Sequence, residues 1–214
     1  MSNKNKLARG IYYVAYGKPA IQAALQSIES VGYSNPELPT CVVTDAPQDF
    51  ADTPSHIVDY DSDRYGRKAK LRADLLSPFK HTLYLDADTR VNLSVDYIFQ
   101  CLSDGWDFVV TLSEQQKANW LWHVDEKERE TTEAIVGMTP LQFQGGVWAF
   151  RKSPAMRSFF SNWRKEYETA LGTPDQAALT RAWHKKPIKT FLLGREWNGG
   201  AVIPHYYGNA KRKD

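Results

Sequence analysis

Two carboxylates that follow an apolar segment are the strongest sign of chemistry in this sequence. Asp86 and Asp88 flank one small residue, Ala87, directly after the apolar run at 82–85. Such a run is typical of a central buried strand, and ligands of open α/β sheets bind beyond the carboxyl ends of the strands. Two close carboxylates repel each other unless a cation lies between them or one is protonated. The pattern therefore predicts a divalent-cation site, and oxygen ligands favour Mg²⁺ or Mn²⁺ over zinc.

The alternative interpretation of Asp86 and Asp88 is a solvated turn, because Asp-x-Asp alone is a common pattern. The apolar strand that precedes the pair favours the functional interpretation. The two cysteines, Cys41 and Cys101, have no nearby Cys or His at zinc-ligand spacing. We interpret both as buried free thiols, so the acidic pair is the candidate metal site.

The elements that must position this pair follow an α/β pattern. A strand-like run at 10–16, a helix from Pro19 and a β-branched strand at 40–44 form the strand–helix–strand unit of a parallel sheet. A polar loop follows at 46–65, and 115–123 is irregular. The other expected elements are a basic helix at 67–77, a buried strand at 82–85, a helix capped by Ser94, a strand at 108–112, a charged helix at 125–135, a strand within 143–150, helices that begin at Pro154 and Thr173, and strands at 188–193 and 202–206.

Length and composition indicate a single globular domain. The chain has 214 residues, of which 42% are hydrophobic and 24% charged, which excludes disorder over the whole length. No stretch approaches the roughly 18 apolar residues that span a bilayer. The positively charged N-terminus has only a short, tyrosine-rich apolar run, which fits a first strand better than a signal peptide. We therefore expect a cytoplasmic protein, and the net charge of +2 does not by itself indicate a nucleic-acid partner.

Several segments, taken in order, resemble nucleotide-diphospho-sugar transferases with the GT-A fold, most of all glycosyltransferase family 8. The resemblance implies a single GT-A-like (Rossmann-related) domain over residues 1–214, with a mostly parallel central sheet flanked by helices. DADT and HYYG with a following Lys are the more specific motifs. The segments are VAYG (14–17), RKAKLRADLL (67–76), LYLDADT (83–89), FQGGVWAFRKSP (143–154), PDQAAL (174–179) and REWNGGAVIPHYYGNAK (195–211).

The resemblance implies a complete metal site. Asp86 and Asp88 would be the metal-binding DxD pair, and His205 would match the family's C-terminal metal-ligating histidine; a structural histidine is the alternative. Asp86 and Ala87 would also contact the donor. Gly208 and Lys211 would meet the diphosphate, because glycine permits close backbone approach and lysine supplies positive charge. The tail from 207 to 214 is expected to be basic and mobile.

The resemblance also implies residues that bind the donor nucleotide. Ala15, Tyr16 and Asp45, at strand ends, would hold the nucleoside. Arg67 and Lys70 would face the donor, and the alternative is that they form an exposed basic helix face.

Four further residues would lie near the reacting sugar or the acceptor. Gln144 and Gly145 match a position where the family usually has Asn, so the sequence departs slightly there. Asp175 and Gln176 match the family's Asp-Gln pair. Residues 173–176 also form a helix capping box, with Pro at the first helical position, and both roles can hold at once. The family's closing Pro-Trp after the lysine is replaced, since Arg212 follows Lys211.

The implied activity is metal-dependent transfer of a sugar from a nucleotide sugar, a UDP-sugar by expectation, to an acceptor hydroxyl. The resemblance favours retention; if the reaction inverts, Asp175 is the first candidate for the general base. A sugar-phosphate nucleotidylyltransferase is the enzymatic alternative, but its Gly-rich basic loop is absent from AYGKPA at 15–20. A binding module without turnover is the second alternative, and the intact acidic pair argues against it.

The acceptor is open at this point. Trp120, Trp122 and the basic tail could bind a nucleic acid such as modified DNA, because basic residues bind phosphates and aromatic rings stack on bases. The same tryptophans could stack on the sugar rings of a glycan. A glycan, a protein or a small molecule together are favoured over DNA.

Overall fold

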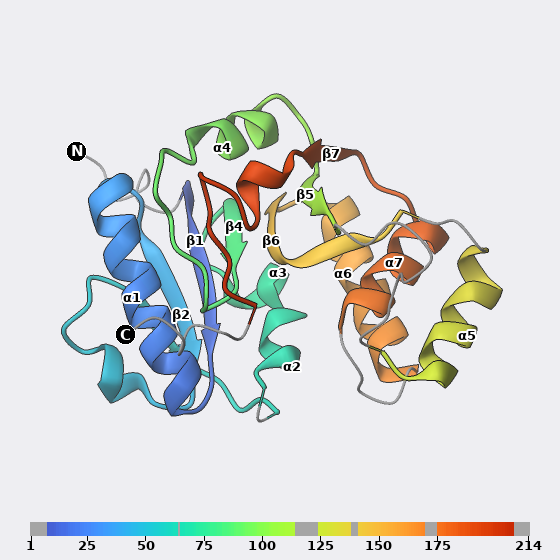
Figure 1. Cartoon of the computed structure of the whole chain (residues 1–214), viewed down its shortest axis with the longest axis horizontal. Coiled ribbons are helices and arrows are strands. Elements are labelled where there is room, and N and C mark those ends of the chain that lie inside the picture. The colour runs from blue at the N-terminus through green and yellow to red at the C-terminus, as the bar shows by residue number, and fades with distance from the viewer. Residues whose placement is uncertain (1–7, 64, 114–123, 138–140, 170–174, 208–214) are drawn as a thin grey trace.

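A sheet of seven strands forms the centre of the described structure, and helices flank it (Figure 1). The computed structural model describes residues 8–63, 65–113, 124–137, 141–169 and 175–207, and in these ranges the strands lie in the order β3-β2-β1-β4-β6-β5-β7. Their bounds are Arg9–Ala15 (β1), Thr40–Thr44 (β2), His56–Asp59 (β3), His81–Leu85 (β4), Phe108–Leu112 (β5), Phe143–Arg151 (β6) and Thr190–Leu193 (β7). The mostly parallel α/β sheet expected from the sequence is confirmed.

The reversed strand β6 determines what lies beside the acidic pair. Strands β3, β2, β1 and β4 are parallel to one another and β5 is parallel to β7, whereas β6 is antiparallel to both β4 and β5. The register of β4 and β6 places Leu85 opposite Val147. The first residues of β6 therefore lie beside the turn that follows β4, and Asp86 N donates a hydrogen bond to Gly146 O at 2.8 Å.

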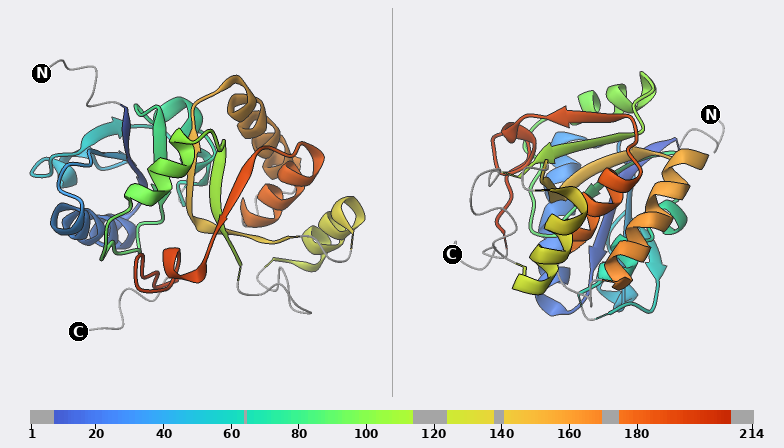
Figure 2. Two further views of the ribbon diagram at one scale, coloured as in Figure 1. Left: turned by 90° about the horizontal axis from the view of Figure 1, so that it is seen from above. Right: turned by 90° about the vertical axis from the view of Figure 1, so that its right-hand side faces the viewer.

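Helices cover both faces of the sheet. Alternate residues of β1 face opposite sides: Ile11 and Tyr13 pack with α1 and α4, while Tyr12 and Val14 pack with α2, α3, α6 and α7. Helices α1 and α5 lie at opposite ends of the molecule (Figure 2). The bounds are Lys18–Ser34 (α1), Arg67–Lys70 (α2), Ala73–Leu76 (α3), Asp96–Ser103 (α4), Glu126–Val136 (α5), Pro154–Thr169 (α6) and Asp175–Lys185 (α7), with 3₁₀ helices at Pro47–Phe50 (η1) and Arg195–Trp197 (η2).

A layer of aromatic side chains packs beneath the end of β4. The rings of Tyr84 and Trp148 are stacked, with their centroids 4.5 Å apart. Met156, Phe160 and Trp163 of α6 are fully buried against this layer, so this face of the helix belongs to the core. Burial of each large side chain contributes roughly 1.5–3 kcal/mol to stability. The strand that precedes Asp86 is therefore packed on a buried aromatic layer.

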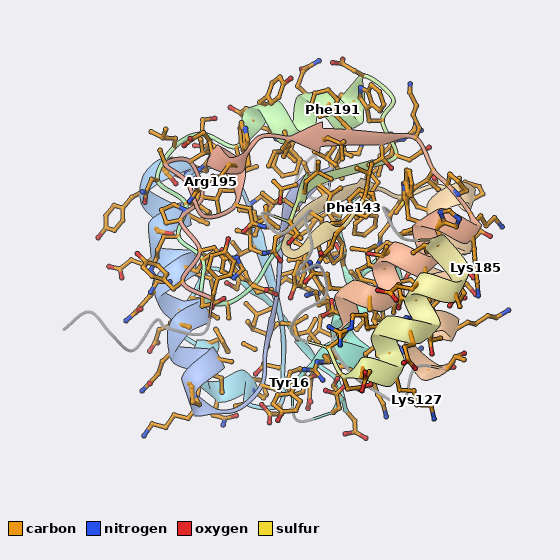
Figure 3. The ribbon with its side chains drawn as sticks, turned by 45° about the vertical axis from the view of Figure 1, so that its right-hand side comes forward. Tyr16, Lys127, Phe143, Lys185, Phe191 and Arg195 are labelled. Carbon is orange, nitrogen blue, oxygen red and sulfur yellow. The ribbon has the colours of Figure 1, made fainter. Side chains whose placement is uncertain are left out.

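A buried charge network joins α5 to α6 and α7. Arg181 Nη1 lies 2.7 Å from Glu128 Oε1 and 2.5 Å from Thr132 Oγ1, and Arg181 Nε lies 3.2 Å from Glu166 Oε2. Lys185 reaches Glu166 from the solvent side at 2.7 Å (Figure 3). Arg181 and Lys185 thus pair with two carboxylates, so the charges buried between these helices are compensated.

Two segments differ from the expectation drawn from the sequence. The predicted loop at 46–65 contains η1 and the edge strand β3, which was missed because β3 is only partly buried and lacks an apolar run. The predicted strand at 202–206 is wrong: this segment forms only an isolated bridge between Thr89 and His205. Its backbone turns back onto η2 through hydrogen bonds to Glu196 O, and a proline in the segment cannot donate to a strand ladder.

Two helix predictions need smaller corrections. The basic segment at 67–77 forms the two short helices α2 and α3, because Arg72 between them has a φ of −110°. The residue that precedes α4 is Val95 rather than Ser94, although Ser94 Oγ accepts a hydrogen bond from Asp96 N at 3.2 Å.

Other expectations fall on parts of the chain that are not described. Residues 115–123 lie within the undescribed range 114–123, and the tail is undescribed from 208 onward. In the described ranges, no helix combines the length and the apolar character needed to cross a membrane.

Candidate functional site

Three side chains that could together hold a metal ion meet at the carboxyl edge of the sheet. Asp86 and Asp88 lie in the turn after β4, and the bridge to Thr89 holds His205 against this turn. His205 Nε2 is 3.1 Å from Asp88 Oδ1 and 3.8 Å from Asp86 Oδ2, and one donor atom of each residue lies within 4.8 Å of the others. Two carboxylate oxygens and an imidazole nitrogen suit a divalent cation. The residues thus fit the metal site that the resemblance implied.

Asp86 is oriented by a buried tyrosine. Tyr84 Oη donates a hydrogen bond to Asp86 Oδ1 at 2.5 Å. Burial, together with the charge of Asp86, raises the pKa of Tyr84 well above its usual value, so the phenol keeps its proton and remains a donor. The other carboxylate oxygen, Oδ2, is the one that faces His205.

Gly146 provides the space in which Asp86 and His205 approach each other. A Cβ at this position would lie 2.3 Å from His205 Cε1 and 2.8 Å from Asp86 Oδ2. These distances are far inside van der Waals contact, so a side chain at this position would displace a ligand. Sequence reasoning named Gly145 as the functional glycine and missed Gly146, although both stand in the segment that carried the resemblance.

Lys70 connects the cluster of Asp86, Asp88 and His205 to Asp175 at the start of α7. Its Nζ lies 2.8 Å from Asp175 Oδ2 and 3.4 Å from Asp86 Oδ1. Burial by itself lowers the pKa of Lys70, but the two carboxylates outweigh burial and the pKa is raised. Lys70 is only 7% exposed, so it does not belong to an exposed basic helix face.

A cavity of about 530 Å³ lies directly beside the acidic cluster. It brings together six residues that were predicted as site residues, namely Arg67, Lys70, Asp86, Ala87, Asp88 and Asp175. A second cavity of similar volume, lined by Phe150, Lys152 and Met156, lies at the other end of β6 and contains none of the predicted site residues.

The wall of the site cavity was only partly foreseen. Its apolar part is formed by Val14, Pro19, Ala20, Ala23 and Tyr65. None of these was predicted as a site residue, because no polar motif marks them. Ala15, Tyr16 and Asp45 do not line this cavity.

The three predicted nucleoside-binding residues lie at the ends of β1 and β2. Ala15 is fully buried, whereas Asp45 is exposed. Tyr16, labelled in Figure 3, is buried, and its hydroxyl donates a hydrogen bond to Tyr60 O. Their role in nucleoside binding stays a prediction.

The residues predicted near the reacting sugar lie around the start of α7 and of β6. Gly145 N donates to Gln144 Oε1 at 2.7 Å, and Trp163 Nε1 donates to Asp175 O at 3.1 Å. Gln176 is buried in the first turn of α7. Residues 173 and 174 of the expected capping box lie outside the described residues, as do Gly208 and Lys211.

Comparison with known proteins was informative at the level of structure alone. No family model matches the sequence, and neither does any curated protein. Among solved structures, the bifunctional glycosyltransferase WbbM superposes with a TM-score of 0.64 at 12% identity, over 89% of this chain and 39% of WbbM.

Two further solved structures match this chain over a larger share of their own length. The galactosyltransferase LgtC, solved with donor and acceptor sugar analogues, matches with a TM-score of 0.60 at 17% identity, over 87% of this chain and 74% of LgtC. Mouse xyloside xylosyltransferase 1 matches with a TM-score of 0.59 at 12% identity, over 89% of this chain and 87% of that enzyme. The fold of this chain is therefore the GT-A-like fold of these glycosyltransferases, as the resemblance in sequence predicted.

Proposed function

We propose that this chain is a metal-dependent glycosyltransferase that moves a sugar from a nucleotide-diphosphate sugar, a UDP-sugar in the first instance, to an acceptor hydroxyl. One observation carries the proposal. Asp86, Asp88 and His205 converge at the edge of a cavity whose wall also includes Lys70 and Asp175. A cavity that combines a divalent-cation site with a buried lysine suits a ligand with a diphosphate group.

The chemistry requires the bond between the anomeric carbon and the diphosphate oxygen to break. A new bond then forms from the anomeric carbon to the acceptor oxygen, and the acceptor's proton leaves. Mn²⁺ or Mg²⁺, held by Asp86, Asp88 and His205, would supply positive charge beside the departing diphosphate. Tyr84 keeps Asp86 oriented, and Lys70 adds a fixed positive charge on the same side.

The resemblance to glycosyltransferase family 8 favours the retaining route. In a retaining reaction with front-face attack, the acceptor's proton passes to the departing diphosphate and no enzyme base is required. In an inverting reaction, Asp175 would take that proton. Lys70 Nζ lies 2.8 Å from Asp175 Oδ2, so Asp175 Oδ1 is the oxygen that would accept the proton in the inverting reaction. The anomeric configuration of the product distinguishes the two routes.

Other parts of the site would bind the rest of the donor. The apolar wall that contains Pro19, Ala20 and Tyr65 suits the sugar ring or the base, since both have apolar faces. Arg67 and Lys70 would face the donor phosphates. Gly208 and Lys211 would complete the diphosphate site.

The test is a screen of nucleotide sugars for Mn²⁺-dependent donor hydrolysis and for protection from thermal unfolding. A bound donor raises the unfolding temperature by mass action. We expect hydrolysis by the wild type, loss of hydrolysis in EDTA and in Asp88→Ala, and wild-type behaviour of Asp104→Ala, which removes an exposed carboxylate after α4. Equal turnover by Asp88→Ala would contradict the metal assignment.

Two alternatives are separated by the same assays. A nucleotidylyltransferase would release pyrophosphate from a nucleoside triphosphate and a sugar phosphate, whereas a binding module would be protected by donor without hydrolysis. For the acceptor, a glycan, a protein or a small molecule is favoured over modified DNA. Binding of a DNA acceptor would weaken steeply with salt, because phosphate contacts release counterions.

A further inference from the structure

A buried asparagine connects the metal-ligating histidine to the sheet. Asn198 directly follows η2 and is 4% exposed. Its Nδ2 donates to Thr111 Oγ1 of β5 at 3.0 Å, and its Oδ1 lies 2.8 Å from His205 Nδ1. Thr111 is itself buried in the sheet, so the amide is attached to a rigid element on one side and to the imidazole on the other.

The direction of the amide decides which ring nitrogen of His205 carries the proton. An amide oxygen can only accept, so Nδ1 opposite Asn198 Oδ1 must be the protonated nitrogen. An imidazole that ligates a cation is neutral and has one N–H, which leaves the lone pair on Nε2 for the cation. That nitrogen lies 3.1 Å from Asp88 Oδ1 and 3.8 Å from Asp86 Oδ2. The lone pair is thus directed to the place where the carboxylate oxygens converge.

The surrounding backbone fixes this arrangement. The ring of Tyr207 stacks on His205 with 4.1 Å between centroids, and Tyr207 Oη donates to Asn198 O at 3.3 Å. Gly199 has a φ of +100°, and a Cβ there would lie 2.8 Å from Tyr207 Oη. Histidine, asparagine and tyrosine therefore form one packed unit in which the imidazole cannot rotate freely.

We propose that Asn198 is a positioning residue that holds His205 as the Nδ1–H tautomer, with Nε2 free to ligate the divalent cation. The inference rests on the proposed function, because it assigns the residue that holds one ligand of the same metal site in place. Outer-shell partners of ligating histidines set the tautomer and ring orientation, and their loss typically costs about 10–100-fold in metal affinity.

The first experiment reads the tautomer directly in protein saturated with diamagnetic Mg²⁺, because without a cation Nε2 can also carry a proton and donate it to Asp88 Oδ1, 3.1 Å away. Long-range ¹H–¹⁵N correlation spectra distinguish protonated from unprotonated ring nitrogens, and the signals that disappear in His205→Gln identify this residue among the five histidines. We expect a protonated Nδ1 and an unprotonated Nε2 in the wild type. A protonated Nε2 would overturn the proposal, because it would mean that the amide of Asn198 faces the ring with its NH₂ group.

The second experiment measures Mn²⁺ affinity by electron paramagnetic resonance without any nucleotide. Asn198→Ala should bind Mn²⁺ about 10–100-fold more weakly, whereas Asn198→Asp should bind at least as tightly as the wild type, since its carboxylate accepts the same Nδ1–H bond. The matched control is Asn35→Ala, which removes another buried asparagine with side-chain bonds to Leu93 O and from Val95 N. Equal affinities of Asn198→Ala and Asn35→Ala would refute the positioning role.

The design separates this inference from the proposed function. Both readouts are taken without donor or acceptor, so they do not require glycosyl transfer. If Mn²⁺ binds in the manner expected but no nucleotide sugar is turned over, the proposed function fails and the role of Asn198 stands. If Asn198→Asp loses Mn²⁺ as severely as Asn198→Ala, the inference fails even where transfer is observed.

Discussion

Replacement of Gly146 by alanine is the sharpest perturbation that the site geometry suggests. The added Cβ would lie 2.3 Å from His205 Cε1, 2.8 Å from Asp86 Oδ2 and 2.9 Å from His205 Nδ1. His205 cannot simply rotate away, because its Nδ1 is bonded to Asn198 and its ring is stacked on Tyr207. Overpacking of this kind costs about 1–3 kcal/mol, and the restricted unfolded chain returns about 0.4–1 kcal/mol. We expect a net loss of about 1–2 kcal/mol.

The adjacent glycine is a matched control for this substitution. A Cβ on Gly145 would meet Lys70 Nζ at 3.5 Å and Asp175 Oδ2 at 3.6 Å, which are ordinary contacts. For a chain of this size, 1 kcal/mol corresponds to about 2–4 °C in unfolding temperature. In calorimetry, Gly146→Ala should therefore unfold about 2–8 °C lower and bind Mn²⁺ at least about 10-fold more weakly, while Gly145→Ala should keep both properties. Wild-type Mn²⁺ affinity in Gly146→Ala would show that the site does not depend on this approach of Asp86 and His205.

Two further substitutions test the buried charges. Lys70→Met removes the cation between two carboxylates of the site, so the free energy of unfolding measured in urea should fall by about 3 kcal/mol. Lys68 is exposed, and Lys68→Met should lower the same quantity by less than about 0.5 kcal/mol. Similar losses for both variants would contradict the buried ion pairs of Lys70. Arg181→Met leaves two buried glutamates without their shared partner and should cost about 3–5 kcal/mol. Lys185→Met, which removes a half-exposed pair, should cost less than about 1 kcal/mol, and a loss as large as that of Arg181→Met would refute the expected difference.

The acidic pair could be predicted because its cause is local. An apolar run followed at once by Asp86 and Asp88 places both carboxylates at the carboxyl end of a buried strand, whatever the rest of the chain does. His205 was found only through the resemblance. The sequence pattern around it suggested a strand, whereas the structure has a turn that is held to Thr89 by one bridge.

The second layer of the site could not be predicted, because it depends on contacts between distant segments. Gly146 lies beside Asp86 only because β6 runs antiparallel to β4 in one register, and periodicity does not specify strand direction. Lys70 seemed equally suited to an exposed helix face, and its burial follows from the position of Asp175 on another helix. Asn198 carries no motif of its own, and its role depends on where η2 places it against β5.

The strand order explains why a cavity forms at this point of the sheet. From β1 the chain proceeds outward to β2 and β3 and then returns to β4 on the other side of β1. The connections after β1 and β4 therefore leave in opposite directions, and a crevice opens at such a switch point. The cavity is lined by Val14 of β1 and Tyr84 of β4, as this rule requires. Topology alone thus locates the cavity, but the cluster of Asp86, Asp88 and His205 beside it also needs the reversed strand β6 and the segment after η2, because Gly146 leaves the space in which Asp86 and His205 meet.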